Sequence, residues 1–244
     1  MVVPASRKAQ RTQRDGEVSM SVILQRVAQY DAILFDFDGV LADSEALHYA
    51  CWTEILSAHG IPLTWEDYRA NCIGITDRAM LEVLRRRVDP PYDIDLLWPE
   101  YPRKKALFRQ KAAANPPIAE ATRELILGLT EVPIAVVSSS GRAELEPVLE
   151  KAGLLHRFET LVCFEDVTRL KPHPDPYLEG ARRLGVSNPL VVEDSDAGVA
   201  AGEAAGFTVL RLDHPDYLAV ALLSHLRKVE MGIDLSARLL TLGE

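Results

Sequence analysis

The sequence has few of the features that mark secreted, membrane-spanning or nucleic-acid-binding proteins. It has only three cysteines in 244 residues, Cys51, Cys72 and Cys163, and no two have the spacing of a zinc site or a redox pair. No apolar run approaches the roughly 20 residues that a transmembrane helix needs. Basic residues number 27 against 36 acidic ones, a balance that disfavours binding to nucleic acid. These absences predict a cytoplasmic protein with no nucleic-acid or membrane partner.

Residues 1–28 differ in composition from the rest of the chain. Within the first 26 residues, five basic side chains stand against two acidic ones, and the stretch up to Met20 has no apolar segment of the kind found in secretory signals. We expect residues 1–28 to form a basic, disordered extension. An organelle presequence and translation from Met20 are the alternatives.

The remaining chain alternates short apolar runs with segments of helical periodicity. This alternation predicts an α/β fold, a Rossmann-like parallel sheet with helices on both faces. The expected strands are Ala32–Phe37, Ile134–Val137, Leu161–Phe164, Leu190–Val192 and Thr208–Leu212. The expected helices of this part are Ile118–Leu129, Ala143–Ala152, Pro176–Leu184, Ala197–Ala205 and Tyr217–Leu226. Sheets of this kind bind ligands at the carboxyl ends of their strands.

One block interrupts the alternation. Between Glu45 and Ala114 the apolar residues recur only with helical spacing, and a proline-rich segment follows. The block therefore predicts an all-helical cap domain inserted after the first strand. The expected domains are the extension over 1–28, a catalytic core over 29–44 and 116–244, and the cap over 45–115.

Two carboxylates stand at the end of the first expected strand. Asp36 and Asp38 are two residues apart, so their side chains share a face and both can point into the crevice just past the strand. A calcium-binding loop also begins with alternating acids, but Val40 stands at its fifth position and the glycine comes too early. A calcium loop is therefore excluded.

Hydroxyl groups and a lysine follow the second and third strands. Ser138, Ser139 and Ser140 precede a helix, where hydroxyls and free backbone N–H groups suit a phosphate, although a serine there can also simply cap the helix. Lys171 lies among prolines, which would hold its ammonium as a fixed charge. Taken alone, it could equally be a surface lysine in a turn.

Two further acids end the fourth strand, at Glu193 and Asp194. Mg²⁺ requires oxygen ligands and commonly takes one or two protein carboxylates together with substrate phosphate. Asp36 and Asp194 would supply such carboxylates from the ends of different strands. The four groups thus predict a site for phosphate and Mg²⁺.

The four groups together resemble the motifs of the haloacid dehalogenase superfamily. The matching segments are Asp36-x-Asp38-Gly-Val, Ser138, Lys171-Pro and Glu193-Asp194-Ser. The helical insertion is similar to the small cap of the phosphoglycolate phosphatase and β-phosphoglucomutase branch, and the likeness spans roughly residues 30–212. This motif set is specific for the superfamily and poorly specific for the substrate.

The resemblance implies catalytic roles for four residues. Asp36 would attack phosphorus and form an aspartyl phosphate, and Asp38 would act as the general acid and then the general base. Ser138 and Lys171 would hold the phosphoryl oxygens.

The resemblance also implies a Mg²⁺ site and a set of substrate contacts. The metal ligands would be Asp36, the Asp38 carbonyl and Asp194, with Glu193 beside the ion. Substrate or phosphate contacts would come from Gly39, Ser139, Ser140, His48 and Arg78. A packing or solvated histidine and an exposed helix charge are the alternatives for His48 and Arg78.

We expect hydrolysis of a small phosphorylated metabolite, of the sugar phosphate or phosphoglycolate class, by a monomer or homodimer. Dehalogenation is disfavoured because that branch lacks the second aspartate, which is present here as Asp38. Phosphonate cleavage needs a lysine early in the cap, whereas the lysines of this cap, Lys104, Lys105 and Lys111, all lie in its last helix.

A phosphosugar mutase like β-phosphoglucomutase is the main rival. Mutase-like sequences place a lysine where this chain has Gly141 and an arginine where it has Asp77, which would weaken the grip on a second phosphate. A non-catalytic module that binds Mg²⁺ or phosphate is the remaining alternative.

Overall fold

The structure, a computed structural model, describes residues 29–73 and 75–230, and the expected extension over 1–28 lies outside the described residues. Five parallel strands form one sheet in the order β3-β2-β1-β4-β5. The strands are β1 (Ile33–Phe35), β2 (Ile134–Val137), β3 (Thr160–Val162), β4 (Leu190–Glu193) and β5 (Thr208–Arg211). The α/β class expected from the sequence is confirmed.

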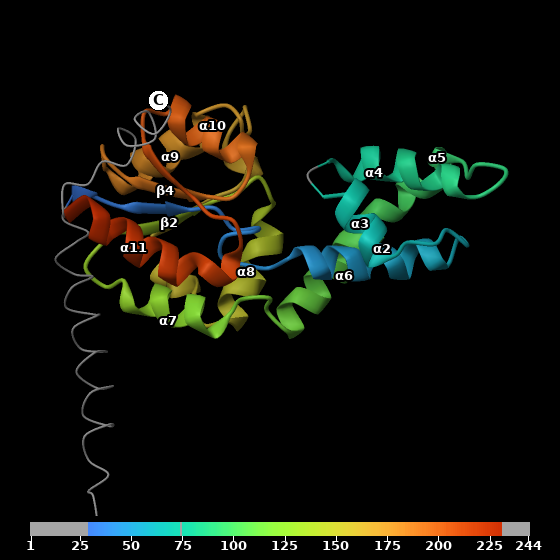
Figure 1. The fold of residues 1–244 in the computed structure, drawn as a ribbon, viewed down its shortest axis with the longest axis horizontal. Helices are drawn as coiled ribbons and strands as arrows, with labels where there is room; N and C mark the ends of the chain where they lie inside the picture. The colour runs from blue at the N-terminus through green and yellow to red at the C-terminus, as the bar shows by residue number, and fades with distance from the viewer. Residues whose placement is uncertain (1–28, 74, 231–244) are drawn as a thin grey trace, which may run out of the picture.

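Helices cover both faces of the sheet because neighbouring strand residues face opposite sides. Ile33 and Phe35 pack with α7, α8 and α11, whereas Leu34 packs with α9 and α10. Figure 1 shows α9 and α10 on one face of the sheet, with α7 and α11 on the other. These helices are α7 (Glu120–Gly128), α8 (Arg142–Lys151), α9 (Asp175–Leu184), α10 (Asp196–Ala204) and α11 (Leu218–Glu230). Three short 3-10 helices complete the core, at Leu155–Arg157, Phe164–Asp166 and Pro215–Tyr217.

Three strands end before their expected apolar runs: β5 by one residue, and β1 and β3 by two. β1 ends before Phe37, because the carbonyl of Phe37 accepts the N–H groups of Leu41 and Ala42, at 3.0 and 2.9 Å, and the chain turns there. β3 ends before Cys163, because the Asp166 carboxylate accepts the Cys163 N–H at 2.8 Å and starts a 3-10 helix. Local hydrogen bonds thus end β1 and β3 before the apolar pattern stops.

The insertion after β1 contains helices and no strand among its described residues. It comprises α2 (Glu45–Ser57), α3 (Trp65–Asn71), α4 (Asp77–Leu84), α5 (Ile94–Leu97) and α6 (Tyr101–Ala114), with 3-10 turns at Arg85–Arg87 and Trp98–Glu100. These helices lie to one side of the sheet (Figure 1) and bury an apolar cluster of their own around Trp52 and Leu81. We call this unit the cap.

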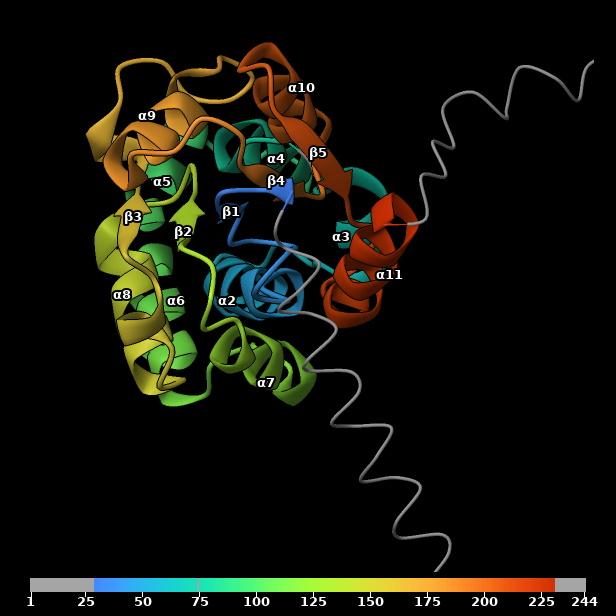
Figure 2. The same cartoon turned by 90° about the vertical axis from the view of Figure 1, so that its left-hand side faces the viewer.

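The cap is joined to the sheet through α2 and α6. Cys51 on α2 and Phe108 and Ala112 on α6 belong to the apolar cluster beneath the sheet, and α6 runs beside α8 (Figure 2). Among the helices of the described part, none is both long and apolar enough to cross a bilayer.

The strand order places one crevice at the centre of the sheet. The chain runs from β1 outward to β3, then returns to lay β4 on the other side of β1. Ligands of such sheets bind outside the carboxyl ends of the strands where this direction reverses. The residues after β1 and β4 therefore meet at this point.

Candidate active site

Lys171 connects the ends of three strands. Its Nζ donates hydrogen bonds to Asp36 Oδ1 and Glu193 Oε1, both at 2.6 Å, and to the Val137 carbonyl at 2.9 Å. The side chain is only 5% exposed. Burial by itself disfavours the ammonium form, but the two carboxylates outweigh it and raise the pKa of Lys171. The site therefore contains a fixed, buried positive charge.

Asp36 is buried beside this charge. Burial raises the pKa of Asp36 well above its usual range, and the nearby carboxylates of Glu193 and Asp38 raise it further, whereas Lys171 lowers it. Asp36 Oδ2 accepts no hydrogen bond from the described residues, so one oxygen of this carboxyl is free to face a ligand.

Glu193 is fully buried and uses both of its oxygens. Oε1 accepts from Lys171 and from the Tyr177 hydroxyl at 2.8 Å. Oε2 accepts from the N–H groups of Asp194 and Ser195 and from the Ser195 hydroxyl. Burial alone would raise the pKa of Glu193, but Lys171 and these donors lower it overall. Glu193 thus anchors Lys171 and the turn after β4.

The small size of two glycines makes room for these acids. A Cβ at Gly198 would overlap the Glu193 carboxylate, and a Cβ at Gly39 would overlap that of Asp194. Gly39 also has a φ of +78°, a conformation that side chains disfavour. Its N–H donates to the Ala42 carbonyl at 2.9 Å, and the contact of Gly39 with phosphate stays a prediction.

Three carboxylates gather at a place suited to a divalent cation. Asp36, Glu193 and Asp194 each offer an oxygen within 4.8 Å of the others. Burial, followed by the charge of Glu193, raises the pKa of Asp194 to about 6, although a backbone hydrogen bond and Lys171 lower it in part. Because hard cations such as Mg²⁺ prefer carboxylate oxygens, the residues fit this ion.

Asp38 is held by two hydroxyl groups. Ser44 Oγ donates to Asp38 Oδ1 at 2.7 Å, and Ser140 Oγ donates to Asp38 Oδ2 at 2.9 Å. Ser44 is buried at the start of α2, and Ser140 follows β2. The position of Asp38 thus depends on the cap helix α2 as well as on the sheet.

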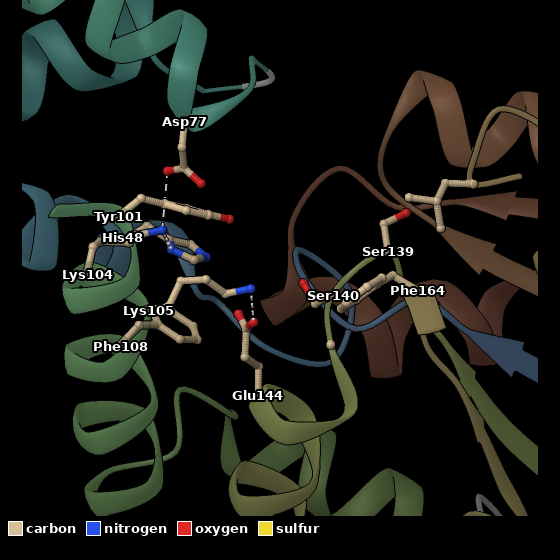
Figure 3. A pocket seen from close by; sticks show the side chains of 12 residues that line it. His48, Asp77, Tyr101, Lys104, Lys105, Phe108, Ser139, Ser140, Glu144 and Phe164 are labelled. Atoms are coloured by element: carbon tan, nitrogen blue, oxygen red, sulfur yellow. Dashed lines mark hydrogen bonds and ion pairs between the residues drawn. The ribbon is translucent and has the colours of Figure 1, made fainter. Parts of the chain in front are cut away.

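The three serines after β2 occupy different surroundings. Ser138 is buried, and its Oγ accepts the Ser140 N–H at 3.0 Å, which leaves its own proton free to donate. Ser139 is exposed and faces the space between sheet and cap (Figure 3). The Ser140 hydroxyl donates to Asp38.

Two adjoining cavities lie between the cap and the carboxyl end of the sheet. One has a volume of about 410 Å³ and the other about 610 Å³. Figure 3 shows the smaller one, with His48, Asp77, Tyr101 and Lys104 from the cap facing Ser139 and Ser140. The cap thus supplies one wall of the space in front of the sheet.

His48 and Lys104 form a buried pair in the cap wall. Lys104 is 4% exposed, and its Nζ lies 2.9 Å from His48 Nδ1. Because an ammonium group only donates, Nδ1 must accept, and the proton of the neutral ring is then on Nε2. Burial, followed by the charge of Lys104, lowers the pKa of His48 to about 4. His48 also stacks on Phe108, with ring centroids 4.2 Å apart.

Lys104 and Asp77 are site residues that the sequence reasoning did not identify as such. Lys104 Nζ lies 3.3 Å from Asp77 Oδ1, which also accepts from Trp52 Nε1 at 2.6 Å. The spacing of Lys104 from His48, 56 residues, contains no signal for this contact. Arg78 lines the larger cavity from an exposed position, with its guanidinium 5.1 Å above the Trp98 ring.

A parallel α/β sheet with acids and a buried lysine at its switch point has the arrangement of a small-molecule site of an α/β enzyme. Comparison with known families agrees with this class. The sequence model described as haloacid dehalogenase-like hydrolase matches residues 33–212. The chain belongs to this family and is a hydrolase.

The curated relatives include several phosphatases. Fructose-1-phosphate phosphatase YqaB of Escherichia coli is 30% identical over 197 residues, covering 73% of this chain and 94% of the relative. Validoxylamine A 7'-phosphate phosphatase of Streptomyces hygroscopicus subsp. limoneus is 31% identical over 183 residues, covering 72% and 83%. A solved hydrolase of the family from Deinococcus radiodurans R1, with bound phosphate and sodium, is 32% identical, with a TM-score of 0.62 and coverage of 82% and 89%. The relatives are thus similar to the chain over most of their own length.

Proposed function

We propose that this protein is a Mg²⁺-dependent phosphatase that hydrolyses a small phosphorylated metabolite, of the sugar phosphate or phosphoglycolate class, through an aspartyl-phosphate intermediate. The observation that carries the proposal is the contact of Lys171 Nζ with Asp36 Oδ1 at 2.6 Å, at the carboxyl end of the sheet. It combines a carboxylate able to attack phosphorus with a fixed charge able to neutralise the phosphoryl oxygens.

In the first step, an Asp36 oxygen attacks phosphorus and the bond from phosphorus to the ester oxygen breaks. Asp38 donates a proton to that leaving oxygen. The Ser138 hydroxyl and Lys171 hold the phosphoryl oxygens during the transfer. The products of this step are an alcohol and a phosphorylated Asp36.

In the second step, Asp38 takes a proton from water, and the water oxygen attacks the same phosphorus. The bond between phosphorus and Asp36 breaks, which releases inorganic phosphate and restores the carboxylate. The hydroxyls of Ser44 and Ser140 keep Asp38 at the mouth of the site in both steps.

Asp36, Asp194 and the Asp38 carbonyl would hold Mg²⁺, which supplies positive charge that favours the ionised form of Asp36 and offsets charge on the phosphoryl group. Glu193 completes the acidic group by anchoring Lys171, since both of its oxygens already accept hydrogen bonds. His48 and Arg78 would contact the rest of the substrate from the cap wall.

The proposal includes a cytoplasmic location and a monomer or homodimer. Cys51, Cys72 and Cys163 are free and buried, which suits a reducing compartment.

The experiment is a measurement of inorganic phosphate release from a panel of sugar phosphates, phosphoglycolate and β-glucose 1-phosphate, with Mg²⁺ or with EDTA. We expect Mg²⁺-dependent release, and its loss in Asp36→Asn. Glu150→Gln, an amide substitution at an exposed acid, is the matched control. Unchanged release by Asp36→Asn would refute the nucleophile.

A phosphomutase is the second candidate, since a solved structure described as β-phosphoglucomutase from Clostridium difficile shares the fold, with a TM-score of 0.62 at 20% identity. Formation of glucose 6-phosphate from β-glucose 1-phosphate, without phosphate release, would favour it. Neither product from any substrate would favour a module that only binds Mg²⁺ or phosphate.

A further inference from the structure

The charged side chains around the two cavities balance one another. The acidic ones are Glu45, Asp77 and Glu144, and the basic ones are Arg78, Lys104 and Lys105. The space that receives the leaving group therefore offers no excess of positive charge, although the substrate carries a phosphate at its other end.

Two of the three cations are already paired. Lys104 Nζ lies 3.3 Å from Asp77 Oδ1, and Lys105 Nζ lies 2.5 Å from Glu144 Oε1. A second anion on the substrate would have to approach these carboxylates as closely as it approaches the lysines. Since like charges in a partly desolvated site repel strongly, the pairs disfavour an anionic leaving group.

The third cation, Arg78, is in a weaker position. Its guanidinium stacks over the Trp98 ring on the exposed side of the larger cavity. Solvent and salt screen an exposed charge of this kind. Across the same cavity, the Glu45 carboxylate accepts the Tyr68 hydroxyl at 3.0 Å and provides an opposing charge.

The Asp77 carboxylate has a fixed orientation, and one of its oxygens is an unused hydrogen-bond acceptor. Its Oδ1 accepts from Trp52 Nε1 at 2.6 Å, and Trp52 is fully buried, so the carboxylate is locked in place. Its Oδ2 accepts no hydrogen bond from residues 29–73 or 75–230, although Asp77 lines both cavities. Figure 3 shows the carboxylate facing the space in front of the sheet. A free carboxylate oxygen accepts a hydrogen bond from a hydroxyl and repels an anion.

We propose that Asp77 selects the leaving group: its Oδ2 accepts a hydrogen bond from a substrate hydroxyl, and its charge excludes a second phosphate or a carboxylate. The substrates are then monophosphates of neutral polyhydroxy compounds, and bisphosphates and phosphorylated acids such as phosphoglycolate are poor substrates. This inference rests on the proposed phosphatase function and narrows its substrate class.

The test compares matched substrates that differ in one group. Glycerol 3-phosphate and 3-phosphoglycerate differ by a hydroxymethyl against a carboxylate, and fructose 1-phosphate and fructose 1,6-bisphosphate differ by a second phosphate. We expect kcat/KM to favour the member with the neutral leaving group in each pair by at least about tenfold, because placing like charges side by side costs enough free energy for such a difference.

Two substitutions should change the ratio of kcat/KM between the neutral and the anionic member of each pair in opposite directions. Asp77→Asn leaves the charge of Lys104 unbalanced, so the preference for the neutral member should fall by roughly tenfold. Lys104→Met leaves Asp77 unbalanced, so the preference should rise. General damage to the cap would not separate the two variants in this way. Asp67→Asn, which removes a cap acid paired with Arg87 at 2.8 Å outside both cavities, should leave the ratio unchanged.

The outcomes separate this inference from the proposed function. Phosphate release that favours the anionic members, or a ratio that Asp77→Asn does not change, overturns the role of Asp77 and leaves the phosphatase standing. Absence of release from every substrate overturns the proposed function. In that case the same four compounds are titrated calorimetrically into Asp36→Asn and into the double variant with Asp77→Asn. The inference is supported if Asp36→Asn binds the compounds with a neutral leaving group more tightly than their anionic counterparts and the double variant does not. Any other result overturns it.

Discussion

At the scale of single residues, Lys171 combines a proposed catalytic role with a structural one. Its ammonium group is the shared partner of Asp36 and Glu193, and its side chain is almost completely buried. Removing the charge leaves two carboxylates without their partner in a poorly solvated place, which costs much more than the loss of a surface ion pair.

We therefore expect Lys171→Met to lower the free energy of unfolding by about 3–5 kcal/mol near neutral pH and to abolish phosphate release. Lys111→Met is the matched control, because Lys111 pairs with Glu54 at 2.9 Å on the surface, where ion pairs contribute little. Urea denaturation of the two variants and the wild type measures the difference. Equal stability of the two variants would contradict the structural role of Lys171.

The buried ring of His48 predicts a pH effect on stability. Burial and the charge of Lys104 lower the pKa of His48 from 6.5 to about 4, and the carboxylates of Asp38 and Asp77 oppose this only in part. Between these two pH values the unfolded chain takes up a proton that the folded chain resists. The free energy of unfolding therefore falls as the pH falls through this window.

Because His48 is partly open to the cavity, we expect its share of this loss to be about 2 kcal/mol, less than full burial would give. His48→Gln removes the titrating ring, so its unfolding free energy should depend less on pH than that of the wild type over the same window. Urea denaturation at several pH values measures both curves. Parallel curves for the two proteins would show that the ring titrates normally.

At the scale of secondary-structure elements, two helix starts use their hydroxyl residues differently. Thr64 precedes α3 and accepts the Asp67 N–H at 3.2 Å, as an N-cap residue does. Ser44 precedes α2 but makes no such cap, and its hydroxyl donates to Asp38 instead. The N-cap residue of α2, Ser44, thus holds Asp38, the expected general acid, and does not cap the helix.

This difference predicts opposite effects of two alanine substitutions. Thr64→Ala should lower the free energy of unfolding by about 1 kcal/mol with kcat unchanged. Ser44→Ala should change stability less but lower kcat several-fold with little effect on KM, because Asp38 loses one of the two donors that orient it. Denaturation and steady-state kinetics on both variants provide the comparison. A kcat for Ser44→Ala equal to that of the wild type would show that Ser140 alone positions Asp38.

Most of the strands could be predicted from the sequence because the central strands of the sheet are buried on both faces. Apolar runs located all five strands, whereas several strand ends were misplaced by one or two residues, including the end of β3 at Cys163. The sequence also predicted that the acids and Lys171 lie close together, because the carboxyl ends of parallel strands share one edge of the sheet. The contacts of Lys104 with His48 and Asp77 could not, because they depend on how the cap helices pack and leave no periodic signal.

At the scale of the whole molecule, the described residues form three apolar clusters. Two of them pack on the two faces of the sheet, and the third lies inside the cap around Trp52 and Leu81. The cap is joined to the core through Cys51 and Phe108, which are buried beneath the sheet. Since stability follows the apolar area buried, the cap should be the less stable unit.

All three tryptophans, Trp52, Trp65 and Trp98, lie in the cap, so their fluorescence reports on this unit alone. In urea, we expect the fluorescence transition at a lower concentration than the final transition in far-UV circular dichroism. Ile55→Ala in the cap and Leu34→Ala in β1 are a matched pair, each costing about 2–5 kcal/mol at a fully buried site. Ile55→Ala should widen the gap between the transitions and Leu34→Ala should close it. Superimposed transitions in all three proteins would mean that α2 and α6 couple cap and core into one cooperative unit, and that the cap cannot open without unfolding the site.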